Sequence, residues 1–587
     1  MSAKDSEDRL GEKLTAEERD RRVLELCEQV AEIEERLIPT GLHVFGRPSS
    51  ESGRADMMRM VASFERPEEG ARALTDLIAE GLGLGSYALL LKTARGEEEA
   101  LRARERVDEM MAQAMERFIA QGREAVVRWL EKEAHVDPIG AQAVFRLLEK
   151  IAVELETNDE LEALRRALRG EYIEPGPGAD IVQNPGILPT GRNTHAVNPY
   201  TVPSSIAYAR AERVVNQLLE RHVKEHGRYP LAMALVLWGL DNIKTQGEGV
   251  AQALWLLGTR PVRDAMNRAT AVEVIPLEEL QRPRIDVVMT VSGIFRDLFG
   301  ATINLLDKAV RAVAELDEPT EMNYVRRHVV EQMSESGCSL DEARLRVFSN
   351  APGNYGTNVN FMVMDSQWEH SGTLGDLFVT RKCFAYGRDE RGRTFEGREA
   401  RRAMDVALAR VEATYQNIDT FEIGITDVDH YFEYLGGVSK AVEQRRGARP
   451  AIYLSDTLSA DAKIRSLEET VRLETRAKTL NPKWYEGMLK HGFRGVAEIE
   501  SHVSNTFGWS ATADAVDDWV YTEVAQTFIL DREMLERLRQ LNPHSAHSLV
   551  RRLLEAEGRG YWDAAPDVLE RLRDIFDGLE DQLEGVG

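Results

Sequence analysis

The sequence contains very little cysteine. Cys27, Cys338 and Cys383 are the only three in 587 residues, and they lie far apart. This count excludes a disulfide framework and a metal site built from paired thiolates, and it is typical of a protein from a reducing compartment. The spacings H-E-x-x-H and C-x-x-C are also absent, so the sequence offers no standard zinc motif. These absences favour a cytoplasmic protein.

Long hydrophobic runs are missing as well. No apolar stretch reaches the roughly 20 residues that a membrane-spanning helix needs. The first residues, MSAKDSEDRLGEKL, are polar and charged, which is unlike a signal or transit peptide. We therefore expect neither a transmembrane segment nor a targeting segment.

Basic charge is in deficit. The chain carries 74 Lys and Arg against 99 Asp and Glu, a net charge of −25. A nucleic-acid-binding protein normally shows a basic footprint, so no nucleic-acid partner is expected. The motif G-x-x-x-x-G-K-[ST] is absent too, which excludes a P-loop for ATP in this chain.

The pattern that is present predicts an α/β fold with large all-α portions. At 587 residues two to four domains are expected. Apolar residues with helical spacing dominate 1–170, including a helix from Thr15 to Leu37 and helical stretches at 70–82, 97–132 and 140–168. Near-continuous apolar runs, YPLAMALVLWG and RIDVVMTVSG, then alternate with helices, as buried parallel strands do.

Three domains follow from this reading. Residues 1–170 form a helical domain, and residues 171–398 form an α/β domain that begins with a long loop, 171–203. Residues 399–587 form a mainly helical C-terminal domain with a short strand at 449–456. The parallel-sheet core is thus expected to be flanked by helical domains.

The loop 171–203 is dense in Pro, Gly and Asn, which disfavour regular helix and strand. Its stretch LPTGRNTHAVNPYTVP carries Arg192, Asn193 and His195. Ordered loops this long are usually functional, and otherwise they are linkers. We interpret it as a segment that lines a cleft. For His195 the alternative is an ordinary hydrogen-bonded loop residue.

Polar residues also gather where the two predicted strands end, which is where ligands bind in parallel sheets. After the first strand come Asp241, Lys244 and Glu248, whose spacing would place them on one helix face. Arg282, Arg284 and Asp286 precede the second strand, and Arg296 and Asp297 follow it. A structural ion pair between Arg284 and Asp286 is the alternative for those two.

Ten blocks of sequence together resemble one family, from about residue 14 to the C-terminus. They include EYIEPGPGAD, LPTGRNTHAVNPYTVP, LWGLDNIKTQGEGVAQALWLLGTRPV, RPRIDVVMTVSGIFRDLF, FSNAPGNYGTNVN and NTFGWSATADAVDDWVY. The chain is similar to the large, porphyrin-binding H subunits of magnesium chelatase, which act in chlorophyll and bacteriochlorophyll synthesis. It resembles the large subunit of cobaltochelatase more distantly. Members of this family are about twice as long, so the resemblance implies their C-terminal half.

The resemblance implies ATP-dependent insertion of Mg²⁺ into protoporphyrin IX. Two propionates of the macrocycle call for Arg or Lys, pyrrole deprotonation calls for a base, and Mg²⁺ favours carboxylates. By residue type and position, the candidates for substrate binding are Arg192, Asn193, Lys244, Arg282, Arg284 and Arg296. The candidates for the catalytic base are His195 and Glu248, and those for the metal ion are Asp241 and Asp297, with Glu248 as a further ligand.

The resemblance also implies partners. ATP would be hydrolysed by a separate AAA+ ATPase, the I subunit, acting with the D subunit. Further partners would be a separate N-terminal half of the H subunit and Mg-protoporphyrin methyltransferase. Two other functions stay open: a cobaltochelatase-type component of cobalamin synthesis, and a non-catalytic, half-length tetrapyrrole carrier or regulator.

Overall fold

A computed structural model describes residues 41–585, apart from 67–68, 94–97, 177, 179–180, 183, 195–197, 371, 390, 421 and 458–461, together with five single positions before residue 41. Two compact units follow from its internal contacts. Unit 1 comprises residues 1–195, 420–422 and 481–491, and unit 2 comprises residues 196–419, 423–480 and 492–587. Of the predicted helix from Thr15 to Leu37, only Arg19, Leu26, Val30 and Ile33 are described, and all four are helical.

Unit 1 is helical in its described part. Its helices are α3 (Glu51–Ala62), α4 (Leu74–Gly81), α5 (Tyr87–Thr93), α6 (Glu98–Gln121), α7 (Arg123–Ala134), α8 (Pro138–Glu156), α9 (Glu160–Leu168) and α24 (Pro482–Leu489). The helical stretch predicted at 97–132 consists of two helices, because the chain breaks at Gly122 between α6 and α7. Gly122 has φ +77°, a left-handed conformation that glycine adopts at little cost.

The loop 171–203 holds more local structure than its composition predicts. Short parallel strands β1 (Pro175–Gly176) and β2 (Asn193–Thr194) pair with each other, and 3₁₀ turns η2 (Pro185–Ile187) and η3 (Pro199–Thr201) follow Asn184 and Asn198. Each Asn caps its turn with its side-chain oxygen. These are local devices that the Pro and Asn residues themselves supply.

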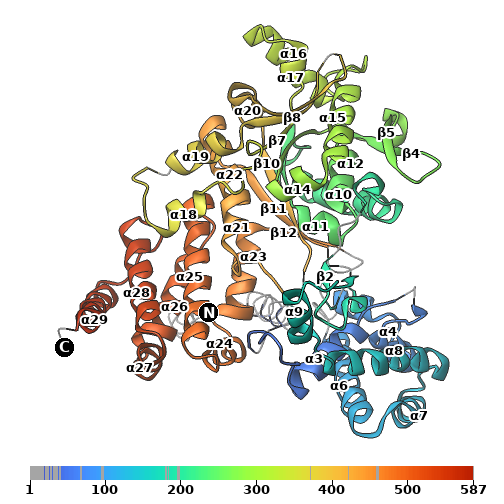
Figure 1. Ribbon diagram of the computed structural model, residues 1–587, viewed down its shortest axis with the longest axis vertical. Helices are drawn as coiled ribbons and strands as arrows, with labels where there is room; N and C mark the ends of the chain where they lie inside the picture. Colours follow the sequence, from blue (N-terminus) through green and yellow to red (C-terminus); the bar gives the residue numbers. More distant parts are fainter. Residues whose placement is uncertain are drawn as a thin grey trace. The chain divides into compact units, whose positions relative to one another are not determined.

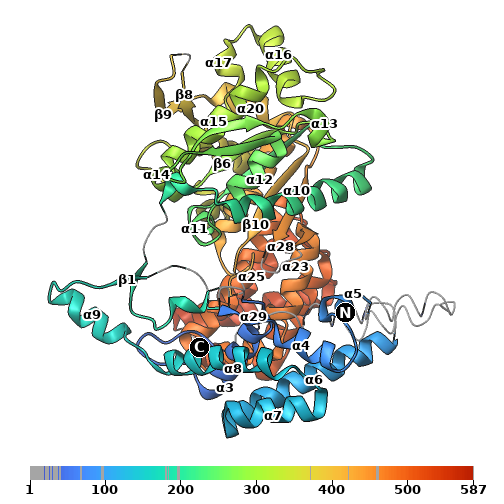
Figure 2. The same cartoon turned by 90° about the vertical axis from the view of Figure 1, so that its right-hand side faces the viewer.

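Unit 2 is built on an eight-stranded sheet, which confirms the predicted α/β class. The strands are β3 (Ala232–Leu237), β6 (Asp286–Val291), β7 (Val347–Ser349), β8 (Phe384–Arg388), β9 (Thr394–Glu399), β10 (Ala413–Ile418), β11 (Ala451–Asp456) and β12 (Lys463–Ser466). Their order is β12-β11-β10-β3-β6-β7-β8-β9. The strands β11, β10, β3, β6 and β7 are parallel, and the pairs β11–β12, β7–β8 and β8–β9 are antiparallel. The β8–β9 hairpin is visible at the sheet edge in Figure 2.

Both predicted strands, and the one predicted at 449–456, are present as β3, β6 and β11. Every residue of β3 and β6 is buried, which explains their unbroken apolar runs. The boundary predicted at 398/399 falls inside β9, and β10 pairs with β3 in the same sheet. Figure 1 shows the orange β10 and β11 beside the green strands. Such non-local pairing has no local sequence signal.

Helices cover both faces of this sheet. They are α10 (Ser205–His226), α11 (Gly239–Lys244), α12 (Glu248–Leu257), α13 (Leu277–Leu280), α14 (Gly293–Leu298), α15 (Gly300–Ala314), α16 (Tyr324–Ser336), α17 (Leu340–Ala343), α18 (Val359–Met364), α19 (Gly372–Lys382), α20 (Arg401–Leu408), α21 (Asp429–Tyr431) and α22 (Gly437–Arg446). The core joins α10, α12 and α15 to one face, and α19, α20 and α22 lie on the other (Figure 1). A separate hairpin, β4 (Thr259–Arg263) with β5 (Ala269–Val274), packs on α15.

The rest of unit 2 is helical. It comprises α23 (Leu467–Glu474), α25 (Phe493–Ala513), α26 (Asp518–Val524), α27 (Arg532–Leu541), α28 (Pro543–Gly558) and α29 (Pro566–Glu584), with π-helices η4 (Phe432–Gly436), η5 (Thr475–Thr479) and η6 (Ala525–Leu530). No described helix is both long and apolar enough to cross a membrane.

The strand order creates a switch point between β3 and β10. From β3 the chain proceeds to β6 and β7 on one side, and it later returns to β10 and β11 on the other. Connections therefore leave the carboxyl ends of β3 and β10 in opposite directions, the arrangement that forms a crevice in open parallel sheets. Ligands of open parallel sheets bind at such a point.

Candidate active site

Charged side chains occupy the switch point. Trp238 directly follows β3 and Asp419 directly follows β10. The ammonium of Lys244, at the end of α11, lies 2.9 Å from Oδ2 of Asp419. This ion pair joins the two strand ends across the crevice. Asp419 had no distinctive spacing in the sequence, and only the pairing of β10 with β3 reveals it.

Asp241, Lys244 and Glu248 do not share one helix, so that prediction is wrong. Thr245–Gly247 separates α11 from α12, and Glu248 is the first residue of α12. Gly247 has φ +91°, and a Cβ placed on it would lie 2.3 Å from Cγ1 of Val202. The end of the long loop thus rests on the turn that leads to Glu248. A hydrogen bond joins the same two segments, because the N–H of Ser204 donates to the carbonyl of Gln246 (2.9 Å).

Three carboxylates nevertheless meet at this point. Asp241, Glu248 and Asp419 are 4%, 1% and 6% exposed. Burial raises the pKa of Asp241 well above its ordinary value, and the carboxylates of Asp419 and Glu248 raise it further. Burial also raises the pKa of Glu248 to about 6, against the opposing effect of Arg210 and Arg213. Acids arranged in this way take up protons readily near neutral pH.

Some hydrogen-bonding capacity in the crevice is unused. Oε1 of Glu248 is buried and has no hydrogen-bond partner among the described residues, and the same holds for Nε2 of Gln416. The other oxygen of Glu248 faces Nε of Arg210 at 3.6 Å. Because buried polar atoms are nearly always satisfied, these atoms mark a place for water or a ligand. No group of three or more described His, Cys, Asp or Glu residues has the geometry of a metal site.

An aromatic wall closes one side of the crevice. The Trp238 ring meets the rings of Tyr431 edge-on at 5.9 Å and of Tyr434 at 4.5 Å. Trp238 Nε1 donates to Oε1 of Gln416 (3.3 Å). Burial raises the pKa of Tyr431, and the nearby carboxylates of Asp419 and Asp241 raise it further. Tyr431 is therefore close enough to Asp241 and Asp419 for their charges to change its pKa. Sequence patterns did not identify this aromatic wall.

The end of β6 supplies a cation next to an apolar surface. Arg296 donates from Nε to Oδ1 of Asp297 (2.7 Å) and from Nη1 to the carbonyls of Ala351 (2.9 Å) and Asn354 (2.8 Å). Its Nη2 is buried and unpaired among the described atoms. The hydrogen bond from Arg296 lowers the pKa of Asp297. Arg296 therefore has one buried guanidinium nitrogen for which no hydrogen bond is found among the described residues.

Beside it lies an apolar shelf, which we define as Leu240, Ile294, Leu298 and Tyr355. These four side chains are 38–55% exposed. A Cβ added to Gly239 would touch Ile294, and one added to Gly293 would touch Tyr355, so α11, α14 and the 350–355 loop pack closely. The guanidinium carbon of Arg296 lies 5.1 Å from the Tyr355 ring centre. The shelf presents exposed apolar side chains near the carboxyl ends of β3 and β6.

Arg282 and Arg284 lie at the opposite, amino edge of the sheet. Arg282 donates to the carbonyls of Trp255 and Leu256. Arg284 is fully buried, pairs with both oxygens of Glu318 (2.7 and 2.8 Å) and donates to two further carbonyls. The donors of both arginines are already used within the protein. Both lie at the amino edge, so the structure does not bring them together with Lys244 and Arg296 at the carboxyl edge.

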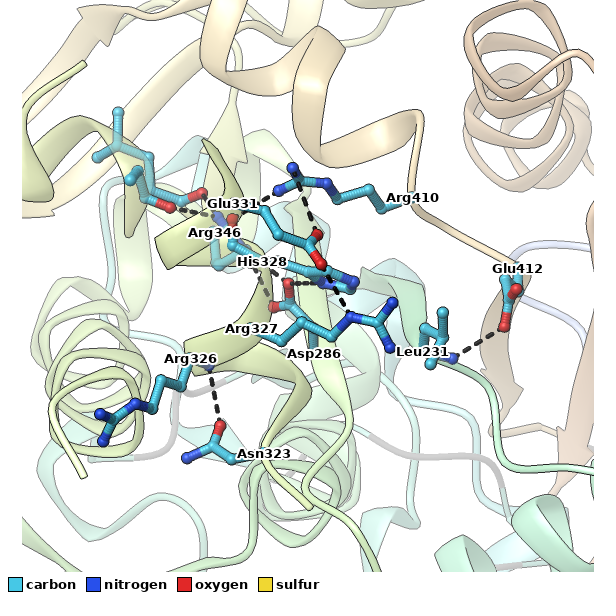
Figure 3. Close-up of polar contacts among 12 residues, drawn as sticks. Leu231, Asp286, Asn323, Arg326, Arg327, His328, Glu331, Arg346, Arg410 and Glu412 are labelled. Carbon is cyan, nitrogen blue, oxygen red and sulfur yellow. Dashed lines mark hydrogen bonds and ion pairs between the residues drawn. The ribbon is translucent and has the colours of Figure 1, made fainter. Parts of the chain in front are cut away.

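Asp286 forms a structural ion pair, but its partner is not Arg284. Figure 3 shows its carboxylate between Arg346, which donates twice (2.8 and 2.9 Å), and Nδ1 of His328 (2.8 Å). All three side chains are buried. Arg346 and His328 hold the pKa of Asp286 below its ordinary value although burial opposes them. This cluster ties β6 to α16 and to the start of β7.

The residues predicted in the long loop lie in unit 1 or outside the described part. Arg192 is exposed and packs against Gly176, whose added Cβ would lie 2.9 Å from the arginine Cδ. The backbone of Asn193 belongs to β2 and pairs with Pro175. His195 is among the residues that the structure does not describe. Their functional roles stay predictions.

Comparisons with known proteins agree with this architecture. The family model described as CobN/Magnesium Chelatase matches residues 2–569. The chain is 43% identical over 603 residues to "Magnesium-chelatase subunit ChlH, chloroplastic" of Oryza sativa subsp. indica, covering 98% of this chain and 43% of the relative. It is 33% identical to "Aerobic cobaltochelatase subunit CobN" of Pseudomonas aeruginosa, covering 94% of this chain and 46% of the relative.

A solved structure shows the same fold. The catalytic subunit of cobaltochelatase from Mycobacterium tuberculosis matches with a TM-score of 0.88 and 31% identity, over 97% of this chain and 47% of that one. The chain thus spans less than half the length of these relatives. The matched family model covers almost the whole chain, and the relatives are similar along nearly all of it. The chain belongs to the CobN/magnesium chelatase family.

Proposed function

We propose that this chain is the part of a magnesium chelatase large subunit that binds protoporphyrin IX and accepts its pyrrole protons during Mg²⁺ insertion. The observation that carries the proposal is the group of three buried carboxylates at the switch point, where burial raises the pKa values of Asp241 and Glu248 and the neighbouring carboxylates raise that of Asp241 further. Insertion replaces two pyrrole N–H protons by one Mg²⁺, so the reaction releases two protons. The higher identity to the magnesium enzyme, 43% against 33%, supports magnesium as the metal.

Glu248 suits the role of proton acceptor. Its pKa of about 6 lies near working pH, where a general base is most effective. Its unpaired Oε1 leaves one lone-pair direction open to a pyrrole N–H or to a relay water. Asp241 and Asp419 supply hard oxygen ligands of the kind that Mg²⁺ favours, and an arriving cation would relieve their repulsion. Asp297 stays a further candidate for this ion.

The apolar shelf and Arg296 suit the macrocycle. A tetrapyrrole presents a flat apolar face and acidic side chains at its rim. The shelf would bury that face, and the free Nη2 of Arg296 would donate to a carboxylate, where a charge-assisted bond is strong. Lys244 would serve as a second cation. We propose that Arg192, Asn193 and His195 approach the substrate from the long loop, and we leave Arg282 and Arg284 out of the site.

The remaining components of the reaction would come from other chains. We propose that ATP is hydrolysed by an AAA+ I subunit with the D subunit, and that the missing part of the large subunit is a separate chain or segment. A methyltransferase that consumes Mg-protoporphyrin is a further proposed partner. The three dispersed cysteines fit a reducing compartment such as the cytoplasm.

Binding and turnover test the proposal separately. Protoporphyrin IX and a hydrogenobyrinate-type corrin are titrated into the chain, with quenching of tryptophan fluorescence as the readout. Tighter binding of protoporphyrin supports the magnesium function. The TM-score of 0.88 to a cobaltochelatase subunit favours cobalt as the second candidate, and preference for the corrin would establish it.

Turnover is then measured with the ATPase subunits, ATP, Mg²⁺ and the missing part of the large subunit. Formation of Mg-protoporphyrin, lost in Glu248→Gln, is the expected result. A mixture that binds porphyrin but forms no product would favour the carrier function instead and would refute the proposal.

A further inference from the structure

A short loop next to the candidate active site is held in place from several sides. We define the clamped loop as Gly424–Asp427, which lies between β10 and α21. Glu474, the last residue of α23, accepts the N–H groups of Ile425 (2.8 Å) and Thr426 (2.9 Å). A Cβ on Gly424 would lie 2.1 Å from Oε1 of Glu474, so no larger residue fits this arrangement.

Helix α25 grips the same loop with three side chains from one face. His502, Asn505 and Trp509 are spaced by three and four residues, the spacing of a helix face. Asn505 donates to the carbonyl of Thr426 (2.8 Å), and Trp509 donates to that of Ile425 (2.9 Å). His502 contacts both Thr426 and Asp427. Side chains from two helices, α23 and α25, thus hold the clamped loop.

The hydrogen bonds of Thr426 indicate whether Nδ1 of His502 carries a hydrogen. A hydroxyl has only one proton to donate. The hydroxyl of Thr426 gives it to Oε2 of Glu474 at 2.9 Å, because a carboxylate that already receives two N–H groups acts as an acceptor. Toward Nδ1 of His502, 3.3 Å away, the same hydroxyl must therefore accept, so Nδ1 carries a hydrogen.

The other ring nitrogen faces an ionised carboxylate. Nε2 of His502 lies 3.0 Å from Oδ1 of Asp427, and Oδ2 of Asp427 receives the ammonium of Lys478 and the N–H of Gly424. Burial alone would raise the pKa of Asp427, but Lys478 and His502 together hold it below its ordinary value. An ionised carboxylate only accepts, so Nε2 carries a hydrogen too.

We propose that His502 is a buried imidazolium, with a proton on both ring nitrogens, that positions the clamped loop and with it Tyr431 at the candidate active site. The charges balance, because two carboxylates, Asp427 and Glu474, accompany two cations, His502 and Lys478. His502 is 1% exposed, so its charge would be held inside the protein. Tyr431 follows Asp427 by four residues and stands against Trp238. The effect on turnover rests on the proposed function, whereas the protonation state does not.

The charged groups around His502 come from every element that forms this cluster. Asp427 belongs to the loop, Glu474 to α23 and Lys478 to η5, and none of them is more than 16% exposed at its side chain. The π-helical turn η5 directly follows Glu474 and brings Lys478 to the same carboxylate. Such turns inside helices often accompany functional sites. His502 acts through the loop and is a positioning residue.

Nuclear magnetic resonance of the full chain with ¹⁵N-labelled histidine tests the protonation state. The signal of His502 is assigned by its absence in His502→Arg. Both ring nitrogens are expected to show the signature of N–H nitrogens at neutral pH, whereas in a neutral imidazole one of the two carries no hydrogen. A spectrum in which one nitrogen lacks its proton at neutral pH would overturn the proposal.

Two variants test the positioning role. His502→Gln keeps hydrogen-bonding atoms but removes the charge, and His502→Arg restores the charge with several N–H donors. In the reconstituted chelatase, Gln should lower kcat by about 100-fold, the cost of a displacement of roughly 1 Å, and Arg should restore most of the rate. Equal activity of the Gln variant and the unmodified protein would refute the positioning role. If the unmodified protein itself forms no metalloporphyrin, the proposed function fails, and the ¹⁵N spectrum alone decides the state of His502.

Discussion

Replacing Glu248 with Gln should make the protein more stable and at the same time less active. Burial raises the pKa of Glu248 from 4.5 to about 6. Each pKa step corresponds to about 1.4 kcal/mol, so the ionised side chain lowers the stability of the folded state by about 2 kcal/mol. Glu248→Gln removes this cost, while it also removes the proposed proton acceptor.

The sign of the effect depends on pH. The folded protein binds the Glu248 proton more tightly than the unfolded chain does, so stability falls as pH rises through the window from 4.5 to 6. Above this window the full cost of about 2 kcal/mol applies, and at pH 5 it is only about 0.8 kcal/mol. The gain from Glu248→Gln should therefore be large at pH 8 and small at pH 5.

Urea unfolding followed by tryptophan fluorescence measures this gain at both pH values. Glu220→Gln on the exposed face of α10 is the matched control, and it should leave the unfolding midpoint unchanged at either pH. Mg-protoporphyrin formation should fall by about 100-fold or more in Glu248→Gln, the usual contribution of a general base. A variant that is less stable at pH 8, or equally stabilised at both pH values, would refute the electrostatic reasoning.

Three further substitutions probe other parts of unit 2. Arg296→Lys should weaken protoporphyrin binding about tenfold or more, because an ammonium cannot serve the loop carbonyls and a carboxylate with the same fixed fork, and unchanged affinity in a fluorescence titration would remove Arg296 from the site. Asp286→Asn should lower the free energy of unfolding by about 3–5 kcal/mol, because it leaves Arg346 buried without its charge partner. Glu331→Gln, in the exposed pair with Arg327, should lower it by under about 1 kcal/mol. Equal urea midpoints for the two variants would contradict this. Gly247→Ala should cost about 1–2 kcal/mol from its left-handed backbone alone, and a stability equal to the unmodified protein would show that the turn before α12 has relaxed.

The two edges of the sheet serve different purposes in this protein. At the amino edge, Arg284 and Asp286 have complete sets of partners, so their charges stabilise the packing of β6. At the carboxyl edge, Glu248 and Arg296 keep buried atoms that have no hydrogen-bond partner among the described residues, which costs stability and fits the proposed substrate role. Sequence position alone could not separate these cases, because both edges carry Arg and Asp beside the same strand.

Much of the fold was predictable because its signals are local. The unbroken apolar runs of β3 and β6 indicated buried parallel strands, and helical spacing indicated the helices between them. The break between α11 and α12 was missed, although Gly247 gave a local signal. It has φ +91°, and glycine is the residue most often found in the left-handed conformation that ends a helix.

The sequence by itself determined the fold class, the family and half of the candidate site: Asp241, Lys244 and Glu248 follow a buried strand, and strand ends are where polar residues meet ligands. Only the tertiary structure decided that Asp419 completes this group and that the clamped loop adjoins it. The reason is that β10 pairs with β3 across about 180 residues of chain, and a contact of that range leaves no pattern in either segment. The tertiary structure also determines the pKa of Glu248, because this pKa depends on burial and burial is created by the whole fold.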